Sequence, residues 1–367
     1  MTVTPRPGIM DVAAYVGGEA HLAGHNRVIR LASNETPLGP SPRAMEAYRA
    51  HAGELHRYPD GGALELRRAL ARHYGIDADR IVCGAGSDEL IALLVRAYAG
   101  PGDEVLYSRH GFLMYAISAK TAGAVAVAAP EQDLTADPDA LLAHVTPRTK
   151  ILFLANPNNP TGSLLPAGTI EKLRRMLPPT VLLALDAAYA EYVTRPDYEP
   201  GIKLVEAFDN VVMLRTFSKI YGLAALRVGW AYCPPAIADV LNRVRGPFNV
   251  AAAAQAAAVA ALEDKAHVDR ARAHNERWLP WFRKALEALG LTVYPSAGNF
   301  LLVKFPDAEA ALAFLNGRGI IPRRMASYGL PDCLRITIGT EEELEAVVAA
   351  LAEFLGHGAS RRPAGVR

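Results

Sequence analysis

The chain has 367 residues, of which 51% are hydrophobic and 21% charged, and its formal net charge is +1. This length exceeds what one compact core usually supports, so we expect two domains. The near-neutral charge gives no electrostatic reason to expect a nucleic acid or an anionic membrane as partner. No uninterrupted apolar run approaches the length that crosses a bilayer.

Cysteine usage and the N-terminus narrow the class of protein. The three cysteines, Cys83, Cys233 and Cys333, are far apart in the chain. An odd, widely spaced set predicts neither a disulfide framework nor a zinc site, so no metal is expected. Residues 1–10 lack the apolar stretch of a secretory signal. We therefore expect a soluble cytoplasmic protein.

The first forty residues are rich in turn-forming residues and predict an arm with a short strand. Three prolines and a glycine lie between residues 36 and 42, which excludes a long regular element there. Ser41 followed by Pro42 is typical of a helix start, and this helix should run to about Ala52. A second helix is predicted from Ala63 to Tyr74.

From residue 80 short apolar runs alternate with helical patterns. The predicted strands are 81–83, 105–107, 125–128, 151–155, 181–185 and 211–214. The predicted helices between them are 88–98, 114–122 and 170–176. Continuous apolar strands alternating with helices indicate a mainly parallel sheet that helices cover on both faces.

The composition changes after Pro247. An alanine-rich helix is predicted at 251–262 and a longer amphipathic helix at 268–289, with Pro280 as a potential kink. Strands 300–303 and 334–338 and helices 308–316 and 341–355 complete the pattern. The sequence thus predicts an α/β fold, in which a three-layer large domain (41–250) carries a smaller α+β domain (251–355) that includes an interdomain helix. Residues 1–40 form an arm belonging to the small domain, and residues 356–367 a flexible tail.

Polar groups follow several of the predicted strands. Ligands of parallel α/β sheets bind beyond the carboxyl ends of the strands. The turn Gly84–Ser87, Asn159, Asp186 and Lys219 all stand at such ends. Each alone has an ordinary explanation: a tight turn, turn chemistry before a proline, a helix cap and a surface lysine.

Taken together, these groups describe a receptor for one molecule, pyridoxal phosphate. A lysine in apolar surroundings has a lowered pKa and can form a Schiff base with an aldehyde. Asp186 would keep a pyridine nitrogen protonated, which makes the ring an electron sink, and the released Lys219 would then move the substrate proton. The phosphate would be held by Ser87, Ser218 and Arg227, and the phenolic oxygen by Asn159 and Tyr189. Asp88 is a further candidate cofactor-binding residue.

Three motifs in this order resemble those of the fold type I pyridoxal-phosphate aminotransferases. They are Asn159-Pro160-Thr161-Gly162, Asp186-x-x-Tyr189 and Ser218-Lys219-x7-Arg227. Within this family the chain is similar to the histidinol-phosphate branch across roughly residues 9–355. That finer similarity is carried by Leu31-x-x-Asn34-Glu35-x-Pro37, Arg57-Tyr58-Pro59-Asp60, Gly86-Ser87-Asp88-Glu89 and Leu334-Arg335-Ile336-Thr337-Ile338-Gly339.

The resemblance implies further roles. Phe112 would stack on the cofactor ring, and Arg335 would bind a carboxylate in a bidentate pair. Arg323 would help bind the phosphate of the substrate, and Tyr15 would border its imidazole. Tyr58 would reach across a dimer interface to cofactor and substrate, which implies a homodimer with shared active sites.

The implied activity is amino transfer between L-histidinol phosphate and 2-oxoglutarate. Two alternatives remain among enzymes: an aromatic amino acid aminotransferase and a threonine-phosphate decarboxylase. A cofactor-binding regulator is disfavoured because no helix-turn-helix segment or basic extension accompanies the domain. An inactive relative is disfavoured by the intact set of Asn159, Asp186, Lys219 and Arg227.

Overall fold

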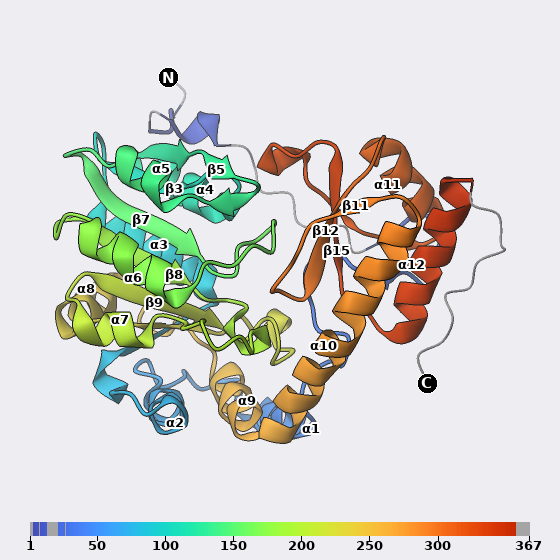
Figure 1. Ribbon diagram of the computed structural model, residues 1–367. Helices are drawn as coiled ribbons and strands as arrows, with labels where there is room; N and C mark the ends of the chain where they lie inside the picture. The colour runs from blue at the N-terminus through green and yellow to red at the C-terminus, as the bar shows by residue number, and fades with distance from the viewer. Residues whose placement is uncertain (1–2, 7, 13–20, 26, 357–367) are drawn as a thin grey trace.

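A computed structural model describes residues 3–6, 8–12, 21–25 and 27–356. Tyr15 and the predicted flexible tail beyond Gly356 therefore lie outside the described residues. The chain forms two sheets with their own helices, seen as the left and right halves of Figure 1. Among the described residues no helix combines the length and apolarity needed to cross a membrane.

The larger sheet has seven strands, of which six run parallel to one another and one runs antiparallel to the rest. In spatial order the strands are β2 (Ile81–Gly84), β10 (Gly229–Tyr232), β9 (Val211–Thr216), β8 (Leu182–Asp186), β7 (Thr149–Ala155), β3 (Glu104–Ser108) and β4 (Val125–Ala129). The antiparallel strand is β10. Apolar side chains point to both faces of the central strands: in β8, Leu183 and Leu185 join one core cluster while Leu182 and Ala184 join the other.

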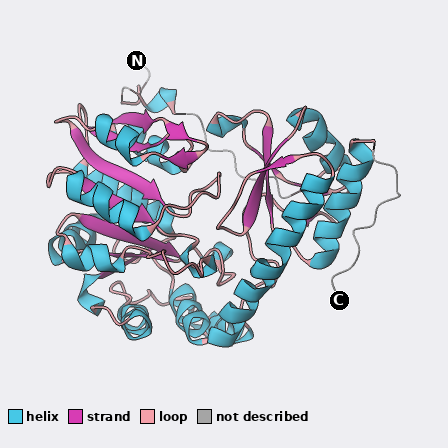
Figure 2. Ribbon diagram, in the orientation of Figure 1, coloured by secondary structure: helices cyan, strands magenta, loops and turns pink. Residues whose placement is uncertain are grey.

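Helices cover both faces, as Figure 2 shows. One face packs against α1 (Pro42–Ala50), α2 (Leu64–Tyr74), α5 (Pro138–Ala143), α6 (Ala167–Met176), α7 (Ile202–Ala207) and α9 (Ala252–Glu263). The other packs against α3 (Ser87–Tyr98), α4 (Leu113–Ala122) and α8 (Pro235–Val244). The predicted three-layer α/β architecture is confirmed.

The smaller sheet is antiparallel, in the order β11 (Thr292–Val293), β12 (Phe300–Lys304), β15 (Cys333–Thr337) and β14 (Arg323–Arg324). Its core packs against α10 (Lys265–Ala288), α11 (Ala308–Gly317) and α12 (Glu341–Phe354). Beside it, β1 (Ile29–Arg30) pairs in parallel with β13 (Ile320–Ile321). The N-terminal arm is thereby joined to the C-terminal half.

Local sequence explains where several helices begin. Ser41 caps α1 by accepting hydrogen bonds from the backbone N–H groups of Arg43 and Ala44, and Pro42 occupies the first turn. Thr340 and Glu343 form a reciprocal capping box at the start of α12. These signals lie within four residues of chain, which is why the helix starts were predictable.

The remaining elements are short. They are a hairpin of β5 (Glu131–Gln132) and β6 (Thr135–Ala136), and single 3₁₀ turns at Ile9–Asp11, Ala52–Glu54, Ala78–Arg80, Ala190–Tyr192, Ala224–Leu226 and Ala326–Tyr328. Sequence reasoning missed β10, because a four-residue strand flanked by turns shows no clear period, and it also missed the ten-residue helix α8. The helix α10 runs unbroken through Pro280. The predicted boundary near residue 250 precedes α9, whose buried alanines contribute to the core of the large sheet.

A buried ion pair joins the end of β9 to the segment that follows β8. Arg215, near the end of β9, contacts the Glu191 carboxylate at 2.7 Å, and the two side chains are only 3% and 8% exposed. The guanidinium also bonds to the hydroxyl of Tyr74 and lies over the ring of Trp230. The pair fixes the chain just before Lys219 to the chain just after Tyr189.

Removing one partner of this pair should cost far more than breaking a surface pair. We expect Glu191→Ala to lower the free energy of unfolding by about 3–5 kcal/mol, because the Arg215 charge stays buried without its partner. Glu171→Ala breaks an exposed pair with Arg175 at the same 2.7 Å distance, and should cost less than about 1 kcal/mol. Urea unfolding of both variants measures the difference, and equal losses would contradict the assignment.

Candidate active site

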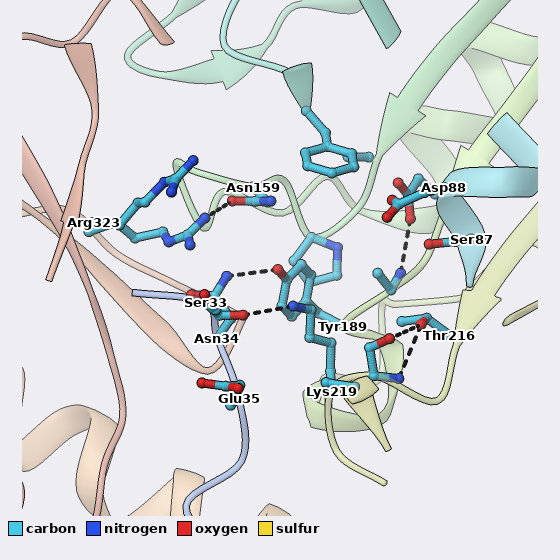
Figure 3. Close-up of a pocket in the computed structure, with 18 of the residues that line it drawn as sticks. Ser33, Asn34, Glu35, Ser87, Asp88, Asn159, Tyr189, Thr216, Lys219 and Arg323 are labelled. Atoms are coloured by element: carbon cyan, nitrogen blue, oxygen red, sulfur yellow. Dashed lines mark hydrogen bonds between the residues drawn. The ribbon is translucent and has the colours of Figure 1, made fainter. Parts of the chain in front are cut away.

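A cavity of about 240 Å³ lies where the carboxyl ends of the large sheet face the smaller sheet. A single water takes up about 30 Å³, so the space suits a small organic ligand. Eleven of the predicted site residues line it: Ser87, Asp88, Phe112, Asn159, Asp186, Tyr189, Ser218, Lys219, Arg227, Arg323 and Arg335. Figure 3 labels Ser87, Asp88, Asn159, Tyr189, Lys219 and Arg323 among them, which come from elements far apart in the sequence.

Lys219 follows β9, and its amine donates a hydrogen bond to the carbonyl oxygen of Ser33 at 2.9 Å. Burial, with the nearby Arg335 charge, lowers the pKa of the lysine to about 8. A substantial share of the amine is therefore neutral near physiological pH. Such an amine is a competent nucleophile and base.

Asp186 ends β8 with 6% of its surface exposed. Burial raises the pKa of its carboxyl to about 6, although the hydroxyl of Tyr115, donating at 2.8 Å, opposes that rise. The carboxylate also accepts a longer bond from the N–H of Ala188. A buried acid of this kind suits a cationic group on a ligand.

An anion cradle lies between the first turn of α3 and Arg227. The Arg227 guanidinium contacts the hydroxyl of Ser218 and the carboxylate of Asp88, each at 3.2 Å. Gly86 precedes α3 with φ +81°, and a Cβ there would meet Arg227 at 2.3 Å. Glycine suits both this positive φ and the close approach of the guanidinium. The N–H groups of the helix start and the guanidinium together fit a phosphate.

Two arginines reach the cavity from the smaller sheet. Arg335 donates to the side-chain oxygen of Asn159 and, at 2.6 Å, to the carbonyl of Ala32. Arg323 is its direct partner across the β14–β15 ladder. Like charges directly opposite each other destabilise a sheet, so this arrangement suits an anionic ligand that neutralises both.

Two aromatic side chains complete the walls. Tyr189 is buried, and its hydroxyl oxygen accepts a hydrogen bond from the amide of Asn34 at 2.8 Å. Burial raises its pKa, so the phenol stays protonated. Phe112 lies just before α4 with its ring edge-on to Tyr115.

Two predicted residues are not seen in the cavity. Tyr58 is 82% exposed and stacks on Phe248, with ring centroids 4.6 Å apart. It lies outside the residues that line the cavity of a single chain. Tyr15 falls outside the described residues. The described parts of the chain contain no His, Cys, Asp and Glu cluster suited to a metal ion.

Sequence reasoning missed several contributors, among them Ser33, Asn34, Tyr115 and Tyr328, all of which line the cavity or bond to a group that does. Tyr115 had a detectable signal, since it stands three residues after Phe112, in the first turn of α4. Asn34 belongs to a motif already noted, but nothing local indicated that its amide meets Tyr189. Ser33 acts through its backbone, which leaves no signal in the sequence.

Comparison with known proteins agrees with this geometry. Residues 26–351 match the model of the aminotransferase class I and II family. The chain belongs to this family. It is 63% identical to a histidinol-phosphate aminotransferase of Paramagnetospirillum magneticum over 96% of this chain and 98% of the relative. It is 59% identical to the protein of the same name from Rhodospirillum centenum, with 96% and 98% covered.

Solved structures of the family share the fold. The histidinol-phosphate aminotransferase of Sinorhizobium meliloti, in complex with pyridoxal-5'-phosphate, superimposes with a TM-score of 0.88 at 32% identity. The match covers 98% of this chain and 99% of that structure. The fold type I assignment is therefore confirmed. The aspartate aminotransferase of Thermus thermophilus, at 23% identity and a TM-score of 0.80, shares the fold.

The lowered pKa of Lys219 has a direct consequence for its reactivity. In the cofactor-free protein we expect acetic anhydride to modify Lys219 with a half-maximal rate near pH 8, because only the neutral amine reacts. Lys304 provides the control: its contact with Asp332 raises its pKa, so it should need a higher pH. Mass spectrometry of the peptides measures both. Identical pH profiles would contradict the assignment.

The buried Asp186 carboxylate should destabilise the cofactor-free protein, because its position suits ligand binding rather than stability. Its folded pKa of about 6 exceeds the ordinary 3.8. The native state therefore binds more protons between these values, and stability falls as pH rises through them. We expect Asp186→Asn to stabilise the cofactor-free protein by about 2–3 kcal/mol at pH 8. The gain should shrink as pH falls from 6 toward 4. Thermal unfolding across this range tests it, and a pH-independent gain would refute it.

Proposed function

We propose that the protein transfers an amino group between L-histidinol phosphate and 2-oxoglutarate with pyridoxal phosphate as cofactor. The observation that carries the proposal is the placement of the Lys219 amine, the Asp186 carboxylate and the Arg227 cradle around one cavity. The relatives named histidinol-phosphate aminotransferase support the choice of substrate.

The residues present fit the cofactor group by group. Arg227, Ser218 and the start of α3 offer donors for its phosphate, and the glycine at 86 leaves room for them. Asp186 offers a buried anion for its ring nitrogen. When bound, pyridoxal phosphate supplies an electron sink for the carbanion at the substrate carbon.

The chain's own groups would perform the remaining tasks. Lys219 would bind the cofactor covalently through its amine, and the free amine would carry the proton to and from the substrate carbon. Asp186 would keep a proton on the ring nitrogen. Asn159 and Tyr189 would be partners of the phenolic oxygen, and Phe112 would cover the ring.

Substrate anions would be met by the two arginines of the smaller sheet. Arg335 and Arg323 face each other across the ladder at the cavity wall. The phosphate of histidinol phosphate and the carboxylates of 2-oxoglutarate would use this positive surface in turn, because each half-reaction needs an anion bound there.

We also propose that two chains form a homodimer. Six exposed, large apolar side chains gather between residues 38 and 64, and the exposed ring of Phe248 lies against Tyr58. Large apolar side chains exposed in such number within one stretch of chain favour an interaction site. A second copy bound there would bring Tyr58 to the cavity of its partner.

A spectral assay tests the activity. The purified protein should gain a visible absorption band with pyridoxal phosphate, and Lys219→Ala should abolish this band and lower turnover at least about a thousandfold. Histidinol phosphate should convert the spectrum far faster than phenylalanine or threonine phosphate. Preference for phenylalanine, or carbon dioxide release from threonine phosphate, would instead favour the alternatives.

Substituting two neighbouring arginines in turn distinguishes an effect on substrate binding from a general effect on the protein. Arg323→Ala should raise the KM for histidinol phosphate about tenfold or more, as expected for a lost charged hydrogen bond, and change that for phenylalanine little. Arg324→Ala is the matched control, since Arg324 pairs with Glu309 at 2.6 Å and does not line the cavity. Equal effects of the two variants would refute the role of Arg323.

A further inference from the structure

Asn34 occupies an unusual position beside the cavity. It is 1% exposed and lies in the left-handed region with φ +56°. Asparagine adopts this conformation more readily than most residues, but seldom without a local reason. The reason here is a set of hydrogen bonds to distant parts of the chain.

The smaller sheet and its flanking loop hold three of the four polar groups of Asn34. Its backbone N–H donates to the hydroxyl of Thr337 at 3.0 Å, and its carbonyl accepts from the amide of Asn299 at 3.0 Å. The Thr337 hydroxyl, which also bonds to the carbonyl of Leu31, lies 3.2 Å from the side-chain oxygen Oδ1. The remaining group, the Nδ2 amide, points at Tyr189, as Figure 3 shows.

This contact determines the direction of the Tyr189 hydroxyl proton. A phenol carries one proton, and its oxygen here accepts the Asn34 N–H at 2.8 Å. The proton is therefore available for a partner on the other side, where Tyr189 borders the cavity and the Lys219 amine lies 5.9 Å from its ring centre. Burial keeps the phenol protonated by raising its pKa.

We propose that Asn34 is a positioning residue that orients the Tyr189 hydroxyl to donate its proton to the phenolic oxygen of pyridoxal phosphate. The inference rests on the proposed function and assigns a new role within that site. A donor at this oxygen stabilises its negative charge. It thereby eases loss of the proton that the oxygen shares with the linked Lys219 nitrogen.

The pH titration of the visible absorbance of the loaded protein tests the inference without relying on turnover. We expect Tyr189→Phe to move the midpoint upward by about one pH unit, as the loss of one hydrogen bond to a charged group implies. Asn34→Gly keeps the left-handed backbone but removes the amide, and should shift the midpoint in the same direction. Asn34→Asp, which can only accept from Tyr189, should shift it further.

A double-mutant cycle decides whether Asn34 acts through Tyr189. In the Tyr189→Phe background, Asn34→Gly should add no further shift. Asn275→Ala is the structural control: it removes a buried amide bond to the Gly298 carbonyl away from the cavity. It should lower thermal stability and leave the midpoint unchanged.

The possible failures are distinguishable. An unchanged midpoint in Asn34→Gly, an equal shift in the Tyr189→Phe background, or a matching shift in Asn275→Ala would each overturn the role of Asn34 while the visible band upheld the proposed function. A wild-type protein that forms no band with pyridoxal phosphate would overturn both.

Discussion

The site depends on a carboxylate that the fold buries at the end of β8. Asp186 is almost inaccessible, and burial raises its pKa to about 6 even with the hydroxyl of Tyr115 bonded to it. Such a charge is unfavourable unless a cation or donors meet it, so its presence implies a ligand that completes the pairing. The parallel register opposes Asp186 to Leu214 of β9, which brings the segment leading to Lys219 alongside. The buried Asp186 carboxylate and the register of β8 with β9 thus determine where the chemistry takes place.

Charge is distributed unequally between the two sheets. The large sheet and the segments that follow its strands contribute the carboxylate, the amine and the anion cradle, whereas the smaller sheet contributes Arg323 and Arg335. Lys219 and Arg335 both donate to carbonyls of residues 32–33. These backbone dipoles partly satisfy two cations that an anionic ligand would satisfy better. A ligand that bonds to both sheets therefore replaces hydrogen bonds within the protein by bonds to itself. Ligand binding is thereby coupled to the relative position of the two halves.

Much of this site could be predicted because the rule that locates it is local. Continuous apolar strands followed by polar residues indicate a parallel sheet, and the carboxyl ends of its strands meet at one edge. Asp186 and Lys219 follow from that rule alone. The antiparallel β10 and the cross-strand pairing of Arg323 with Arg335 do not, because neither a four-residue strand nor the register of a second sheet has a local signature. The resemblance to known aminotransferases indicated both arginines where physical reasoning could not.

Asn34 illustrates the contacts that local patterns miss. Its partners Tyr189 and Thr337 lie 155 and 303 positions away, and no pattern within one element reports such distances. The pairing of β1 with β13 helps to bring the arm to the smaller sheet, and the Thr337 and Asn299 bonds hold its asparagine in a left-handed turn. Asn34 is held by the smaller sheet, and its amide bonds to the Tyr189 phenol of the larger half. It therefore spans the two halves of the cavity. The energy that holds Asn34 in place therefore comes from the smaller sheet, although its effect is exerted on a side chain of the larger one.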